Sequence, residues 1–77
     1  MELLFYTTSN CHLCEVAENL LIHTPMPKPV PVDVVDIAQS ESLVEKYGTR
    51  IPVLRRNDTG AELDWPFTKD DLITFLE

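Results

Sequence analysis

The chain begins with an apolar run that turns abruptly polar. Residues 3–6 read Leu-Leu-Phe-Tyr, and the four residues that follow, 7–10, are all polar. This pattern is typical of a short central strand buried on both faces and followed by a loop. Either Ser9 or Asn10 in that loop is suited to cap the next element.

Apolar side chains then recur at helical spacing between Cys11 and about His23. They are Leu13, Val16, Ala17, Leu20 and Leu21. Two glutamates and an asparagine occupy positions on the other face. The segment is therefore predicted to be an amphipathic helix with one face toward a core.

The next segment is predicted to be extended. Its alternating prolines exclude a helix: Pro25, Pro27, Pro29 and Pro31. Val30, Val32 and Val34 alternate with Pro31 and Asp33, and a proline and a charge inside a strand are typical of a sheet edge. We interpret Asp33 and Asp36 as solvated charges at that edge. Strand, helix and strand in this order predict a right-handed parallel crossover.

The second half of the chain predicts a helix, a hairpin and a final helix. The first helix of this half begins at Ser40, and Gly48 is placed to end it in a left-handed conformation. Residues 57–60, Asn-Asp-Thr-Gly, are a turn signal that predicts pairing of 53–56 with 61–64. Thr68 and Asp71 match a capping box. The apolar positions of the two helices are Leu43, Val44, Tyr47, Leu72, Ile73, Phe75 and Leu76.

Length and charge narrow the class of protein. The 77 residues suffice for one domain, 1–77, with a thin core. A net charge of −7 with only six Lys and Arg argues against nucleic-acid binding. No apolar stretch approaches the roughly 20 residues that cross a membrane, and the first residues lack a signal-peptide pattern. We expect a cytoplasmic monomer that acts neither on nucleic acid nor at a membrane.

Cys11 and Cys14 are the candidate reactive groups. Cysteines three residues apart on a helix lie on one face, with about 5–6 Å between their Cβ atoms, which suits a disulfide. Cys11 falls at the helix N-terminus, where free N–H groups and the helix dipole favour a thiolate and so a nucleophile. Cys14 lies one turn deeper and is suited to resolve a mixed disulfide. In a reducing compartment such a pair is more often catalytic or metal-binding than structural.

These residues resemble the glutaredoxin branch of the thioredoxin superfamily. Residues 5–7 leading into Cys11-x-x-Cys14 are similar to its first strand and active-site loop, and residues 49–53, Thr-Arg-Ile-Pro-Val, resemble its Thr-Val-Pro signature. Residues 69–72 are similar to the acidic start of its last helix. The resemblance implies an α/β, thioredoxin-like (glutaredoxin-type) fold. Its order is βαβ-α-ββ-α, with a four-stranded mixed sheet flanked by helices.

The resemblance also implies substrate-binding roles for Ile51 and Pro52. The family's proline is cis and faces the cysteine pair. Such a bond would turn the backbone of Ile51 toward an incoming chain, which could then pair with it as a β-strand does.

Three positions depart from the family pattern where glutathione binds. His12-Leu13 replaces Pro-Tyr, residues 7–10 contain no Lys or Arg, and residues 65–68, Trp-Pro-Phe-Thr, replace Gly-Gly. Asp70 and Asp71 could meet the α-amino group of glutathione, but the preference of a helix start for negative charge explains them equally well. We expect no tightly bound cofactor and no metal, and leave glutathione binding open.

His12 and Trp65 are further candidates for substrate binding. A protonated His12 would lower the pKa of Cys11, although adjacent residues on a helix point apart and His12 could equally be exposed and inert. Trp65 with Phe67 either forms the floor of a substrate groove or packs at the rim of the core.

The sequence thus predicts a thiol–disulfide oxidoreductase or small electron donor. Its partners would be protein or small-molecule disulfides and a reductase. One alternative is a metal or iron–sulfur module completed by a dimer or by glutathione, because two cysteines supply only half of a tetrahedral site. The other alternative is a redox-inactive adaptor with a thioredoxin-like fold.

Overall fold

The computed structural model describes residues 1–26 and 29–77, so the extended conformation expected at Pro27 lies outside the described residues. The elements are β1 (Leu3–Thr7), α1 (His12–Ile22), β2 (Val32–Asp36), the 3₁₀ helix η1 (Ile37–Gln39), α2 (Glu41–Tyr47), β3 (Val53–Arg56), β4 (Glu62–Asp64) and α3 (Lys69–Phe75). Apart from η1, this is the predicted order. In the described part of the chain, no helix combines the length and apolar character needed to cross a bilayer.

The four strands form one mixed sheet in the order β2-β1-β3-β4. β1 is central, parallel to β2 and antiparallel to β3, and Phe5 lies opposite Val34 on one side and Leu54 on the other. β3 and β4 are antiparallel. The predicted fold class is confirmed, with β1 buried at the centre and β2 at the edge.

Side chains of β1 and β3 alternate between two separate cores. Leu3, Phe5 and Leu54 face one core, which we call the cysteine-side cluster. The remaining buried members of that cluster come mainly from α1 and α3: Cys14, Ala17, Leu21, Phe67 and Leu72. The opposite core, the tyrosine-side cluster, consists of Tyr6, Ile37, Tyr47 and Val53. Period-two alternation in the central strands is what divides the core into two layers.

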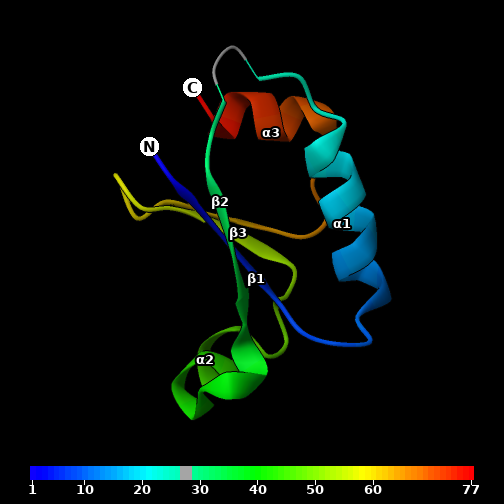
Figure 1. The fold of residues 1–77 in the computed structure, drawn as a ribbon, viewed down its shortest axis with the longest axis vertical. Coiled ribbons are helices and arrows are strands. Elements are labelled where there is room, and N and C mark those ends of the chain that lie inside the picture. The colour runs from blue at the N-terminus through cyan, green and yellow to red at the C-terminus, as the bar shows by residue number, and fades with distance from the viewer. Residues whose placement is uncertain (27–28) are drawn as a thin grey trace.

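The helices are arranged around this sheet as Figure 1 shows. α3 lies across the end of the molecule where α1 finishes, and α2 lies at the opposite end. The start of α1 is therefore remote from α3 in this view. The loop from β1 brings Cys11 to that exposed end of α1.

The buried face of α1 is narrower than its apolar pattern predicts. Cys14, Ala17 and Leu21 are buried, whereas Leu13 and Val16 are 48% and 39% exposed. The spacing of the buried residues corresponds to a single stripe along the helix. The four-stranded sheet and α3 cover only that stripe, and the predicted amphipathic helix is confirmed.

Two details of the helix ends correct the sequence predictions. Gly48 has φ −53° and ψ −34°, so it does not end α2 in a left-handed conformation. Glycine fits there because a Cβ would run into the carbonyl oxygen of Val44, which accepts a hydrogen bond from the Gly48 N–H. Asp36 is not simply a solvated charge, since its carboxylate caps η1 by accepting from the Ala38 N–H at 3.0 Å. The predicted caps at Ser40 and Thr68 are confirmed.

Candidate functional site

The cysteine pair lies where the β1 loop enters α1. Cys11 is itself the N-cap of α1, which corrects the expectation that Ser9 or Asn10 caps the helix. Asn10 instead makes the turn before it, with φ 60°. Cys11 and Cys14 form a disulfide, with their Cα atoms 5.2 Å apart. Cys11 is half-buried while Cys14 is 3% exposed, so Cys11 is the more accessible sulfur.

The N-cap position places one backbone hydrogen-bond donor against the Cys11 sulfur. The Cys14 N–H donates to Cys11 Sγ at 3.1 Å. An anion here is also favoured by the helix dipole of the 11-residue α1. Residues 1–26 contain no Lys or Arg, so within this segment the start of the helix is what favours a thiolate.

His12 and Trp65 occupy different surroundings. The His12 side chain is exposed at the first position of α1. Trp65 is half-buried, packs against the cysteine-side cluster, and meets the Phe67 ring edge-on with centroids 5.0 Å apart. Of the two interpretations of Trp65, this placement favours packing at the core rim.

Ile51 and Pro52 follow α2 and precede β3. The Ile51–Pro52 bond is cis, as the resemblance implied, and the Trp65–Pro66 bond is cis as well. Pro52 is fully buried, and Ile51 is half-buried. The Ile51 N–H already donates to the Tyr47 carbonyl at 3.0 Å, so an incoming chain would find the Ile51 carbonyl as its partner rather than both groups.

Asp70 and Asp71 lie on the first turn of α3, at the end of the molecule away from the start of α1 (Figure 1). The Asp71 carboxylate accepts from the Thr68 N–H at 2.8 Å, and the Thr68 hydroxyl accepts from the Asp71 N–H at 3.1 Å. This reciprocal pair is the predicted capping box. The structure therefore gives Asp71 a role in starting the helix, while Asp70 is exposed.

Four connected polar side chains lie next to the Ile51–Pro52 segment. They are Tyr47, Arg50, Glu62 and Asp64. Arg50 Nε and Nη2 each donate to the Asp64 carboxylate at 2.8 Å, and Nη2 also donates to Glu62 at 2.8 Å. The Tyr47 hydroxyl donates to the other Glu62 oxygen. The Tyr47 ring stacks on Tyr6, with centroids 4.2 Å apart, and the Arg50 guanidinium lies 5.0 Å from the Tyr47 centroid.

Sequence reasoning missed this cluster, although one signal for it exists. Glu62 and Asp64 are two residues apart on a strand and so share a face of β4. Two carboxylates side by side on a strand indicate that a cation lies opposite them. That cation is Arg50, which lies in a loop twelve residues before Glu62. Because the residues are far apart in the sequence, no local pattern predicts that Arg50 pairs with these carboxylates.

The ionisation of the cluster follows from its hydrogen bonds. The hydrogen bond from Tyr47, followed by the one from Arg50, holds the pKa of Glu62 below its usual value. Arg50 likewise lowers the pKa of Asp64. Burial, and then the bond to Glu62, raises the pKa of Tyr47. The carboxylates are therefore ionised and the phenol neutral across the physiological range.

The depressed pKa of Glu62 makes stability depend on pH. We expect Glu62→Gln to be less stable than wild type at pH 7, with the difference shrinking as the pH falls below 4.5. The stabilisation by ionised Glu62 is complete above its unfolded-state value of 4.5 and is lost as the pH falls through the lowered native pKa. Urea unfolding at several pH values measures the difference. Glu45→Gln, at an exposed position of α2, is the control and should match wild type throughout; a Glu62→Gln deficit independent of pH would contradict the ionic explanation.

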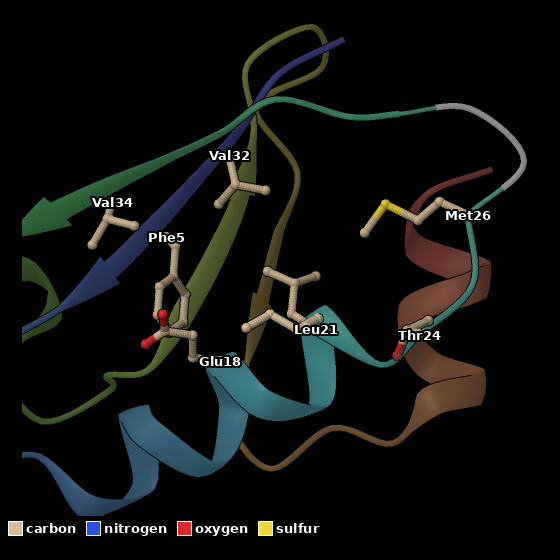
Figure 2. Close-up of a pocket in the computed structure, with 8 residues that line it drawn as sticks. Phe5, Glu18, Leu21, Thr24, Met26, Val32 and Val34 are labelled. Carbon is tan, nitrogen blue, oxygen red and sulfur yellow. The ribbon is translucent and has the colours of Figure 1, made fainter.

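A separate hollow of about 390 Å³ opens between β2 and the second half of α1. Figure 2 shows Leu21 and Met26 bordering it from one side and Val32 from the other. Its lining includes neither cysteine. Val34 at its edge is 60% exposed, so part of the apolar face of β2 is left uncovered.

The described residues contain no group of three or more His, Cys, Asp and Glu side chains arranged to hold a metal ion. Within 1–26 and 29–77, therefore, the cysteines have no further metal-binding partners beside them.

Comparison with known proteins finds a matching family model and similar solved structures. The family model described as "Glutaredoxin-like domain (DUF836)" matches residues 2–77. The X-ray structure of a structural genomics target protein, XcR50 from X. campestris, is 36% identical with a TM-score of 0.83, over 96% of this chain and 93% of that one. A solution structure of the same target is 37% identical with a TM-score of 0.82, over 99% and 92% of the two chains. A search of curated proteins finds no significant match.

Proposed function

Because the chain belongs to the glutaredoxin-like domain family, and because a close Cys11–Cys14 pair supports a thiol redox function, we propose that it is a dithiol–disulfide oxidoreductase or small electron donor. Its substrates are protein or small-molecule disulfides. The observation that supports this most directly is the position of Cys11 as the N-cap of α1, with the nearly buried Cys14 one turn behind it.

The proposed reaction begins from the reduced pair. The Cys11 thiolate attacks one sulfur of the substrate disulfide, forms a mixed disulfide and releases the first substrate thiolate, which takes up a proton. Cys14 then loses its proton and attacks Cys11 Sγ, which releases the second substrate thiol and forms the Cys11–Cys14 disulfide. Two electrons pass from the pair to the substrate with two protons, one from Cys14 and one from solvent, and an external thiol reductant restores the reduced pair.

The different roles of the two cysteines follow from their solvent accessibility and from the electrostatic potential at the start of α1. Attack requires a sulfur that the substrate can reach and that is stabilised as a thiolate, and half-exposed Cys11 at the helix N-terminus meets both requirements. Resolution requires a sulfur held close to Cys11 but shielded from other disulfides. Cys14, 3% exposed, fits that role.

The proposed reductant is a reductase or a free thiol rather than a tightly bound cofactor. Glutathione has little support as a dedicated ligand, because Asp71 is engaged in capping α3 and the Trp65 ring occupies the core rim. We propose that the protein acts as a monomer in the cytoplasm. Electron transfer from a reductase would then proceed by the same exchange at Cys11.

The thiol asymmetry is the first test of the proposal. We expect Cys11 in the reduced protein to be alkylated faster than Cys14, and to titrate below the value of about 8.5 for a free thiol. The measurement is the iodoacetamide alkylation rate against pH, with the modified cysteine identified by mass spectrometry. Unfolded protein in urea is the control, where both cysteines should react alike. A Cys11 that titrates at or above 8.5, or a faster Cys14, would overturn the assignment of roles.

A further inference from the structure

The segment that contains Ile51 and Pro52 is held in place by backbone hydrogen bonds at three consecutive residues, 50–52. The N–H groups of Arg50 and Ile51 both donate to the Tyr47 carbonyl, at 2.8 and 3.0 Å. The Pro52 carbonyl accepts from the Trp65 N–H at 3.1 Å. The segment is thus held to the end of α2 on one side and to the residue following β4 on the other.

The Arg50 side chain adds a further connection between the end of α2 and β4. Its guanidinium donates through two nitrogens to the Asp64 carboxylate, and Asp64 lies opposite Val53 in the β3–β4 ladder. One nitrogen also reaches Glu62, which the Tyr47 hydroxyl contacts from α2. A planar guanidinium makes this forked contact, whereas a Lys ammonium is a single point of charge and cannot reproduce it.

Ile51 links this network to the cysteine pair. It is half-buried and packs against both cores: the tyrosine-side cluster that contains Tyr47 and the cysteine-side cluster that contains Cys14. A shift of the loop that follows α2 therefore also moves Ile51, which borders the cysteine-side cluster as well. Side-chain cores transmit such shifts because they are close-packed.

Building on the proposed function, we propose that Arg50 is a positioning residue for peptide substrates: its fork to Asp64 and Glu62 fixes the Ile51 carbonyl where an extended disulfide-bearing chain pairs with it. Arg50 touches neither cysteine in this role. It sets recognition of the peptide backbone and leaves the sulfur chemistry to Cys11. Small disulfides without a peptide backbone make no use of it.

The test compares two substrates in wild type and Arg50→Lys. The substrates are a disulfide-linked peptide and a small aromatic disulfide, 5,5′-dithiobis(2-nitrobenzoate). We expect Arg50→Lys to raise KM for the peptide about tenfold, because a displaced docking segment loses orientation. The rate with the small disulfide and the alkylation rate of Cys11 should stay unchanged. Asp64→Asn removes the same fork from its other end and should reproduce the effect.

Arg56→Lys is the matched control. Arg56 forms the corresponding fork to Asp58, at the β3–β4 turn, and lies outside the Ile51 segment. Its replacement should leave KM for both disulfides at the wild-type value. Unfolding midpoints of all variants show whether each is folded at the assay temperature.

Three outcomes would overturn the inference. A peptide KM unchanged by Arg50→Lys shows that the fork does not position the substrate. An equal loss with both disulfides, together with slower alkylation of Cys11, shows a structural role alone. If wild type reduces neither disulfide, the proposed function fails and this inference fails with it, whereas the first two outcomes leave the proposed function standing.

Discussion

Cys11→Ser is expected to reduce disulfide turnover to background, a loss of at least about 1,000-fold, because it removes the nucleophile rather than a supporting group. A serine hydroxyl stays protonated near neutral pH, and the start of α1 cannot ionise it as it can a thiol. Steady-state reduction of a peptide disulfide, coupled to an external thiol reductant, measures the loss. Circular dichroism should show an unchanged fold, since serine is itself a good helix cap.

Cys14→Ser provides the paired variant. It should still attack a disulfide through Cys11 but stop at the mixed disulfide, which non-reducing mass spectrometry detects as an adduct. If wild type itself reduced the peptide disulfide no faster than the external reductant alone, and Cys11→Ser matched it, the chain would be the redox-inactive adaptor considered from the sequence. Adducts that form on Cys14 in the Cys11→Ser protein would reverse the proposed roles.

The largest loss of stability is expected from Leu72→Ala. Leu72 is the buried residue of α3 and is fully enclosed in the cysteine-side cluster. Truncation of a buried leucine costs about 2–5 kcal/mol, combining lost apolar burial with the cavity left behind. A 77-residue domain has a total stability of roughly 4–12 kcal/mol, so the change removes a large share of it. Urea unfolding monitored by far-UV circular dichroism measures the effect.

Ile73→Ala is the control for Leu72→Ala. Ile73 is the next residue on the same helix and is 38% exposed, so its truncation should cost about 0.5 kcal/mol or less. A similar cost for both variants would mean that α3 contributes to stability by helix propensity rather than through its contact with the core.

The order of the elements was predictable because each has a strong local signal. The capping box at Thr68, the turn at 57–60 and the alternating prolines are short-range patterns, and the structure confirms the elements they define among the described residues. The cysteine pair is equally local, because its spacing and its place after a strand already indicate the N-terminus of a helix. Chemistry concentrated within four residues can be recognised from sequence.

What the sequence did not reveal depends on contacts between distant residues. The exposed positions of Leu13 and Val16 reflect how little of α1 a small sheet covers, which helix periodicity alone does not state. The Arg50–Asp64 fork joins residues fourteen positions apart. The capping role of Cys11 was missed for a different reason: cysteine is not a usual cap, and only the placement of its sulfur against the Cys14 N–H reveals it.

That cap also affects how much the site must change during a reaction cycle. The Cys14 N–H already points at Cys11 Sγ in the oxidised protein. When the disulfide opens, the sulfur that becomes a thiolate meets a donor that is in place, so little backbone rearrangement accompanies the transfer of electrons. Environments that favour the thiolate favour the reduced form, so we expect the pair to be a stronger oxidant than an unassisted dithiol. In the proposed reaction cycle, one amide would therefore serve both redox states, and its orientation would bias the equilibrium between them.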